Sequence, residues 1–415
     1  MASTTITPKH IFGFRCDVKD NLQYSDDSSV VYPAGHNVVL YSPDNRTQRL
    51  IPGTLESEGI TALCVSPNRR LLAVAERAEK AMITVYDLQT LKRRKVLVST
   101  DAGSKEYVSM SFSSDNKMLV AQSGAPEWNC VLWIWEKSKV AFTVKTTNQQ
   151  GAPIFCCNIS PSNEIPLVSI IGQGIFKMYR LSDSALRPLN PSIGKRDPNM
   201  ILSQAWIPDA TAVVAGGAGG SGNAENKDRL LLGMLDGEVL LLEAHEVRAS
   251  FLCDNGLPVM SIAVYSKGFV VGQDQGVVTI FEKDEKEFYR RSRSFVIENN
   301  LFRVLHMAIS PNEETLVCSL ENNQVYTLLL SNQEIMKTDE MNFDVLGTNN
   351  HMGTVTGLDV CVRKPLIATA SSDKTVRLWN YVDRTCELMK SFNDDLYSVA
   401  IHPTGLMLLI GFADK

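Results

Sequence analysis

Short runs in which apolar and polar residues alternate make up most of the chain. Each run is about five to seven residues long, and turn-forming pairs such as Ser-Pro, Pro-Asn, Asp-Asn and Asp-Gly separate it from the next. Alternation with a period of two places successive side chains on opposite faces, so it predicts half-buried β-strands. Few segments show the spacing of an amphipathic helix. The pattern therefore predicts an all-β protein.

An apolar residue followed by a turn recurs at a regular distance and marks the end of a first strand. Val65, Phe112, Ile159 and Trp206 follow one another at a constant spacing of 47 residues. The series continues less evenly through Tyr265, Ile309, Cys361 and Ile401. A period of about 40–50 residues built only of strands is typical of a WD-repeat β-propeller, in which each repeat forms one four-stranded blade.

Counting these landmarks predicts seven blades before residue 347. The strand-like run at residues 10–18 is expected to supply the outer strand of the closing blade, because closure removes exposed sheet edges that invite aggregation. The approximate limits of the seven blades are 20–54, 57–99, 105–146, 151–190, 199–252, 257–297 and 301–346.

The repeat pattern divides the chain into two parts. Residues 1–346 are predicted to form a complete seven-bladed propeller, and residues 347–415 the beginning of a second, incomplete one. An eighth repeat starts at about residue 352, and a ninth starts near Asp394 and stops after roughly two strands. We therefore expect that Lys415 does not end a complete domain. The alternative is an eight-bladed ring followed by a loose remnant.

The stretch HMGTVTGLDVCVRKPLIATASSDKTVRLWN, residues 351–380, is the repeat closest to the WD consensus. It predicts a buried hydrogen-bond chain that locks a loop onto the strands. Asp373 in a tight turn accepts from the His351 ring, and the ring reaches the Ser371 hydroxyl, or that of Thr369 on the same face. This hydroxyl then holds the Trp379 indole N–H. Buried polar groups are costly unless paired, so we interpret this tetrad as structural rather than catalytic.

Composition narrows the functional classes. The chain has 415 residues, 44% of them hydrophobic, which is enough for a real core. A net charge of −5 gives no general attraction to nucleic acid or to an anionic membrane, and no apolar run approaches membrane-spanning length. The N-terminal MASTTITPKH lacks the apolar core of a signal peptide. We expect neither a nucleic-acid nor a membrane partner.

No motif indicates catalysis, a cofactor or a metal. The nine cysteines form no Cys-x-x-Cys pair, which favours a reducing compartment and argues against zinc, and the six histidines show no metal-ligand spacing. Gly217, Gly219 and Gly222 form a literal G-x-G-x-x-G within residues 215–228. No helix is predicted to follow, so we interpret the segment as a flexible surface insertion rather than a phosphate-binding loop.

A basic cluster at Lys92, Arg93, Arg94 and Lys95 is the candidate partner-binding site. Its positive charge suits docking to an acidic partner, such as a tubulin tail or another assembly subunit. The alternative is an outer strand whose charges merely protect a sheet edge. Trp128, Trp133 and Trp135 are expected to stack in the core.

Several stretches resemble the family of cilia- and flagella-associated protein 57, WD-repeat proteins of the motile axoneme. They extend from near the start of the chain to its end. These stretches are HIFGFR (10–15), SPNRRLLA (66–73), RKVL (94–97), YSKGF (265–269), EETLV (313–317), RKPLIATAS (363–371), VRLWNY (376–381) and GFADK (411–415).

The resemblance implies two tandem propellers followed by a long coiled coil. It also implies an axonemal scaffold in the cytoskeleton and cytoplasm of the cilium or flagellum. Such a scaffold attaches inner-arm dynein to doublet microtubules, with inner-arm dynein components and doublet microtubule-associated proteins as partners. This chain departs from the family by stopping inside the second propeller and by having no heptad segment. The resemblance supplies no catalytic residues.

Two alternatives stay open. Propellers also serve as adaptors in non-ciliary complexes, so the fold alone does not choose between these settings. A propeller enzyme is the second alternative, and it predicts titratable residues with shifted pKa values converging in the central channel.

Overall fold

The computed structural model describes residues 8–99, 103–148, 150–162, 166–182, 185–208, 228–253, 255–284, 288–297, 301–330 and 342–413. Within these ranges the regular structure consists of antiparallel β-strands and three one-turn 3-10 helices, η1 (Trp135–Lys137), η2 (Pro198–Met200) and η4 (Asp274–Gly276). The all-β prediction is confirmed.

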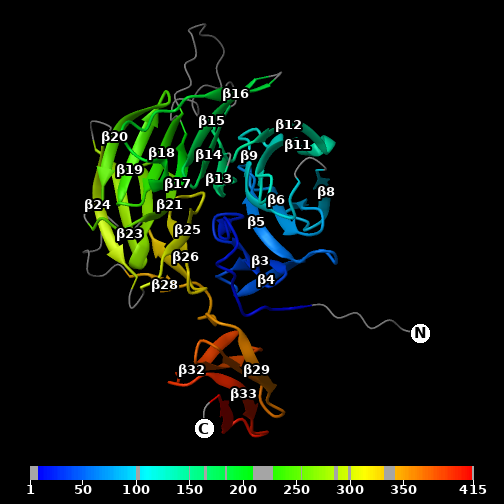
Figure 1. The fold of residues 1–415 in the computed structure, drawn as a ribbon. Coiled ribbons are helices and arrows are strands. Elements are labelled where there is room, and N and C mark those ends of the chain that lie inside the picture. The colour runs from blue at the N-terminus through cyan, green and yellow to red at the C-terminus, as the bar shows by residue number, and fades with distance from the viewer. Residues whose placement is uncertain are drawn as a thin grey trace.

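Seven four-stranded sheets follow one another along the chain and form a ring (Figure 1). The sheets are β1 (Gln23–Tyr24), β2 (Val30–Ala34), β3 (Asn37–Ser42) and β4 (Thr47–Pro52); β5 (Gly59–Val65), β6 (Leu71–Arg77), β7 (Met82–Asp87) and β8 (Arg93–Val98); β9 (Tyr107–Phe112), β10 (Met118–Ser123), β11 (Asn129–Ile134) and β12 (Lys139–Lys145); β13 (Ile154–Ile159), β14 (Leu167–Gly172), β15 (Ile175–Ser182) and β16 (Ala185–Leu189); β17 (Ile201–Ile207), β18 (Arg229–Met234), β19 (Glu238–Glu243) and β20 (Glu246–Leu252); β21 (Val259–Tyr265), β22 (Gly268–Gln273), β23 (Val277–Lys283) and β24 (Tyr289–Val296); and β25 (Val304–Ile309), β26 (Thr315–Leu320), β27 (Val325–Leu329) and β28 (Asp344–Val345).

Each sheet lies in the order of its strands in the chain, which is the topology of a propeller blade. The residues predicted to end first strands do so: Val65 ends β5, Phe112 ends β9 and Ile159 ends β13, while Trp206 lies one residue before the end of β17. The WD-repeat β-propeller predicted from the 47-residue period is therefore confirmed.

Position within the blade explains the burial pattern of each strand. The second strand β14 (LVSIIG) is buried at every position, because neighbouring blades cover both of its faces. The fourth strand β20 (EVRASFL) alternates between exposed and half-buried residues, because one of its faces meets solvent. The sequence pattern thus reports how far each strand lies from the centre of the ring.

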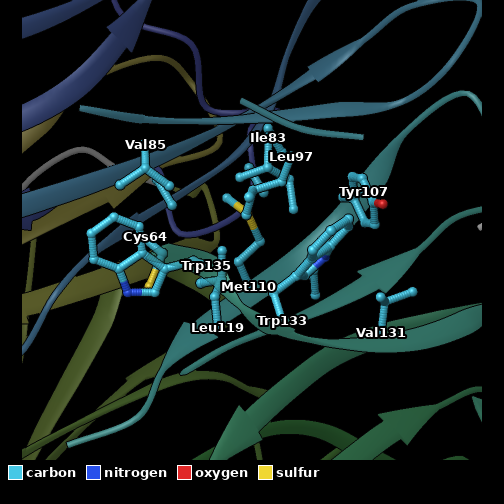
Figure 2. Packing of buried hydrophobic residues seen from close by; sticks show 14 of the residues in the cluster. Cys64, Ile83, Val85, Leu97, Tyr107, Met110, Leu119, Val131, Trp133 and Trp135 are labelled. Carbon is cyan, nitrogen blue, oxygen red and sulfur yellow. The ribbon is translucent and has the colours of Figure 1, made fainter. Parts of the chain in front are cut away.

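The hydrophobic core consists of separate clusters between neighbouring blades. Figure 2 shows the cluster between the blades of β5–β8 and β9–β12, where Trp133 and Trp135 lie with Leu119, Val85 and Tyr107. Trp133 is 1% exposed and Trp135 is 6% exposed.

The predicted stack of three tryptophans is wrong. Trp133 and Trp135 belong to the cluster of Figure 2, whereas Trp128 packs against the next cluster around the ring. Trp128 has a positive φ of 52° in the turn before β11, and this turn directs its side chain to the other face of the blade. Among the described residues, no ring contact joins any two of these tryptophans.

The ring closes between the first and seventh blades without strand exchange. The prediction that residues 10–18 supply the outer strand of the closing blade is wrong. That strand is β28, from the last residues of the propeller's own sequence, and it pairs with β27. Side-chain packing closes the seam: Phe14, Leu22 and Tyr24 share a cluster with Val317 and Val325. The eight-bladed alternative is wrong as well, since seven blades already complete the ring.

A further unit follows the ring. It contains a four-stranded sheet, β29 (Val355–Val360), β30 (Leu366–Ser371), β31 (Thr375–Asn380) and β32 (Thr385–Ser391), and a two-stranded sheet, β33 (Leu396–Ile401) and β34 (Leu408–Phe412). Its orange and red strands lie below the ring in Figure 1. One apolar cluster joins the two sheets, with Leu366, Ala368 and Val376 facing Leu396 and Val399.

Of the Gly-rich insertion at residues 215–228, only Asp228 lies within the described residues, so its interpretation as a surface loop stays a prediction. No helix among the described residues is long and apolar enough to span a membrane.

Candidate functional site

The hydrogen-bond chain predicted from the WD-like repeat lies at the start of the unit that follows the ring. The structure brings His351, Asp373 and Trp379 together. His351 Nδ1 is 3.0 Å from Asp373 Oδ2, and His351 Nε2 is 2.8 Å from Thr369 Oγ1. The Trp379 indole N–H donates to the same Thr369 oxygen at 2.8 Å. With a neutral His351 protonated on Nδ1, every donor in this chain finds an acceptor.

The choice of Ser371 as the hydroxyl of this chain needs correction, because Thr369 takes that role. Ser371 lies at the end of β30, and its hydroxyl accepts from the Asp373 N–H at 3.2 Å within the following turn. Thr369 pairs with Arg377 across β31. This register places Thr369 deeper in the sheet, diagonal to Trp379, where both rings can reach its oxygen.

Asp373 anchors the turn as a carboxylate. Burial opposes its charge, but hydrogen bonds from His351, Thr375 and the Met352 N–H outweigh this effect and hold the pKa of Asp373 well below its usual range. The two side chains at the centre, His351 and Asp373, are 7% and 4% exposed. A group so buried and fully paired stabilises a turn, which agrees with a structural role.

The same tetrad forms part of the junction with the propeller. Phe12, from the N-terminal segment, packs on the Trp379 ring with 4.7 Å between centroids, and His10 contacts Phe12 edge-on at 4.6 Å. The Ile11 backbone N–H and C=O are both bonded to the Gln48 side chain at 2.8 and 3.0 Å. Residues 8–18 thus form a strap between blade one and β31, which we call the N-terminal strap.

A second set of bonds connects the seventh blade to this junction. The Asn323 side chain accepts from the Cys16 N–H at 3.1 Å and lies 3.4 Å from the carbonyl oxygens of His351 and Met352. The first blade contributes as well, because Arg384 between β31 and β32 donates to the carbonyl of Arg46 between β3 and β4 at 2.7 Å. Sequence reasoning missed this role of the strap. The only sequence signal for this role was the apolar alternation of HIFGF, and that pattern predicts a β-strand equally well.

The basic cluster lies on the edge strand of the second blade. All of Lys92, Arg93, Arg94 and Lys95 are exposed, and the last three belong to β8, the outermost strand. Arg94 is ion-paired with Asp87, and this bond, with others from Thr90, lowers the pKa of the Asp87 carboxyl well below its usual range. Within the described part of the chain no ion pair involves the other three, so their charges face solvent.

The central channel contains the titratable residues that the enzyme alternative predicts. A cavity of about 310 Å³ is lined by Lys19, Asp20, Cys156 and His306, among others. Burial lowers the pKa of His306 and raises that of the Cys156 thiol. However, His306 Nδ1 is 3.6 Å from Asp20 Oδ1, and the Cys156 sulfur lies 3.6 Å from Asn158 Oδ1 rather than near an imidazole. These four residues therefore form no activated nucleophile–base pair.

All nine cysteines are free thiols. Across the described ranges no group of three or more His, Cys, Asp or Glu side chains is placed to hold a metal ion.

Comparison with known proteins identifies the relatives of the chain. Residues 344–380 match the family model described as WD domain, G-beta repeat. The chain is 34% identical to cilia- and flagella-associated protein 57 of Mus musculus, over 100% of this chain and 36% of that protein. It is 28% identical to cilia- and flagella-associated protein 57 A of Tetrahymena thermophila, over 98% of this chain and 35% of that protein. A solved structure described as U3-55K superimposes with a TM-score of 0.54 at 13% identity, covering 75% of this chain and 89% of that one, which shows the fold alone.

The closed ring of four-stranded blades and the matched repeat define a WD-repeat β-propeller protein. The chain belongs to the family of cilia- and flagella-associated protein 57. It spans little more than a third of the length of these two relatives.

Proposed function

We propose that this protein is a non-catalytic scaffold of the axoneme in motile cilia or flagella. There it helps to attach or organise inner dynein arms on doublet microtubules, and so supports motility. The observation that carries the proposal is the similarity to cilia- and flagella-associated proteins over the whole chain. A rigid ring suits this role, because its two faces and its rim offer several docking surfaces at fixed angles.

The proposal includes a division of the chain into two domains. Residues 1–346 form the first propeller, and residues 347–415 begin a second. Two observations support this division. The sheet β29–β32 repeats the blade topology outside a ring that is already closed, and β33–β34 packs against it as the next blade packs in the first propeller.

Fractionation of motile cells tests whether the protein is located in the axoneme. An antibody against this chain is used on immunoblots of cell bodies, of ciliary membrane plus matrix, and of salt-washed axonemes. We expect the signal in the salt-washed axoneme and impaired motility after deletion of the gene, without loss of viability. A signal in the cell body or soluble matrix would contradict the axonemal proposal and favour an adaptor of a non-ciliary complex.

The exposed cluster on β8 is the proposed contact for an acidic axonemal partner. Reversing Lys92 and Lys95 to glutamate should weaken the retention of the chain on isolated axonemes, because both ammonium groups face solvent. Arg94 is left intact because it is paired with Asp87. The matched control reverses Lys137 and Lys139 at the edge of the next blade, which are also exposed. Equal loss for both pairs would mean that net charge, not this site, governs retention.

A further inference from the structure

An open cleft of about 480 Å³ lies where the propeller meets the unit that follows it. Three segments that are distant in the chain form its walls: β3 with the turn before β4, residues 345–349 where the chain leaves the ring, and the start of β32 with the turn before it. In Figure 1, β3 and β4 lie at the lower side of the ring and β32 lies below them. The volume is within the range of ligand-binding sites.

The charged side chains of this cleft all carry the same sign. Arg46 and Arg384 line it, whereas the described residues that line it include no Asp or Glu. Arg384 donates to the Arg46 carbonyl at 2.7 Å, which joins two of the walls. Within the described ranges neither guanidinium forms an ion pair. In a chain with a net charge of −5, this cleft is a local reversal of sign that attracts anions.

Further hydrogen-bond donors surround the two arginines. The Tyr41 hydroxyl lines the cleft, and burial raises its pKa, so it keeps its proton at neutral pH. Among the described residues, this hydroxyl and the backbone N–H groups of Gly347 and Thr348 have no hydrogen-bond partner. Donors in an open cleft are hydrated, and an ionised carboxylate is a stronger acceptor than the water it replaces.

The positions of the two charges favour an extended acidic segment over a single small anion. The charge of Arg46 acts on the Tyr41 hydroxyl, whereas that of Arg384 acts on the His10 ring. The two guanidinium groups therefore mark different places along the cleft. Pro43 and Val345 add apolar surface between the walls, where the methylene groups of acidic side chains can pack.

We propose that this cleft binds an acidic segment of a partner polypeptide, with one carboxylate at Arg46 and another at Arg384. Arginine suits this role, because its planar fork of donors matches the two oxygens of a carboxylate. The bound segment contacts the first blade and the following unit together, so it also fixes the angle between them. The site shares no residue with the cluster on β8, and it does not depend on the axonemal setting.

Fluorescence anisotropy tests the cleft with three labelled peptides that differ in one central run, of glutamates, of glutamines, or of phosphoserines at the net charge of the glutamate peptide. We expect the glutamate peptide to bind with an affinity that falls as salt rises, and the glutamine peptide not to bind. Arg46→Gln and Arg384→Gln should each weaken binding roughly tenfold, because each removes a charge-assisted hydrogen bond. The control Arg187→Gln removes the same charge from the exposed face of β16 and should bind as the wild type does.

Arg46→Gln is the decisive variant. Its guanidinium has no other hydrogen bond in the described part of the chain, whereas Arg384→Gln also removes the bond to the Arg46 carbonyl. Unchanged affinity in Arg46→Gln, equal binding of the glutamine peptide, or an equal loss in Arg187→Gln would overturn the site. Clearly tighter binding of the phosphoserine peptide would overturn the assignment to carboxylates.

Small-angle scattering tests the effect on the junction. The glutamate peptide should narrow the distribution of dimensions of the wild type and leave that of Arg46→Gln unchanged. An unchanged wild-type distribution at saturating peptide would show that binding does not fix the angle. Both assays use purified protein, so their outcome is independent of where the protein is found on fractionation of cells.

Discussion

At the scale of single residues, one hydroxyl organises the repeat at residues 351–380. Thr369 accepts from Trp379 and donates to His351, which in turn donates to Asp373. Because the two inner members, Thr369 and His351, each have a partner on both sides, the loop that carries His351 is held to both β30 and β31. The cost of breaking such a chain comes mainly from the polar groups left buried without partners.

Replacing Thr369 with valine therefore tests the chain with little change in shape. It leaves the Trp379 N–H without an acceptor and the His351 Nε2 without a donor, so we expect a loss of about 2–3 kcal/mol in the stability of this sheet. Ser371→Ala should cost about 1 kcal/mol or less, since it removes only a turn contact. Hydrogen exchange at the amides of β30 and β31 measures both. A larger effect of Ser371→Ala would show that the assignment of Thr369 is wrong.

At the scale of elements, the N-terminal strap connects units that are far apart in the chain. It bonds to Gln48 in the first blade and to Asn323 in the seventh, and it packs on Trp379 in β31. Each contact is small, but together they join three elements. The strap is therefore expected to set the angle between the propeller and the unit that follows.

Removing the Phe12 ring should loosen this junction. Phe12→Ala deletes the contact with Trp379 and is expected to cost about 2 kcal/mol of docking free energy. The readout is hydrogen exchange at residues 8–18 together with small-angle scattering, which should show faster exchange and a broader distribution of dimensions. Phe288→Ala is the matched control, because Phe288 is 66% exposed. Identical profiles for the two variants would contradict the role of the strap.

The strap should also respond to pH through His10. Burial, and secondarily the charge of Arg384, lower the pKa of His10 to about 4 from an ordinary value of 6.5. Because the undocked strap binds the proton more readily, docking is stable above pH 6.5 and weakens as the pH falls towards 4. Exchange at residues 8–18 should therefore quicken between pH 7 and 5 after correction for intrinsic rates. His10→Phe, which retains an aromatic ring, should remove this dependence, and an unchanged pH profile would contradict it.

At the scale of the whole molecule, the ring closes at one seam where no connecting segment leads from one blade to the next. The first and seventh blades come from opposite ends of the ring's sequence, and buried side chains hold them together. Asn21 lies at the centre of this seam, 1% exposed, where it accepts from the Ser319 hydroxyl at 2.8 Å and donates to the Cys16 carbonyl at 2.9 Å.

Asn21→Ala should open the ring at this seam first. The variant leaves the buried Ser319 hydroxyl without its acceptor and the half-buried Cys16 carbonyl without its donor, so we expect a loss of about 2 kcal/mol. Hydrogen exchange should rise in β1 and β25 and stay unchanged in β17, on the far side of the ring. The control Asn199→Ala alters an exposed residue. Uniform acceleration around the ring would show that the blades open together and that the seam has no special weakness.

Much of the architecture was predictable because it depends on local periodicity. The ends of β5, β9 and β13 follow from single apolar residues before turns, and the tetrad chemistry follows from residue types at fixed spacing. The predicted outer strand at residues 10–18 was wrong for the opposite reason. The segment does alternate between apolar and polar residues, but a strand can pair only with a sheet edge that has no partner. The outer edge of β27 is already paired with β28.

Short-range patterns in the sequence were enough to predict the all-β class, the number of blades before residue 347 and the residue types of the buried hydrogen-bond chain. The tertiary structure was needed to show that Thr369 rather than Ser371 completes the chain, that Phe12 packs on Trp379, and that β28 pairs with β27 at the edge predicted for residues 10–18. These contacts join residues up to several hundred positions apart. Their geometry depends on how blades pack around a ring, which no local pattern encodes.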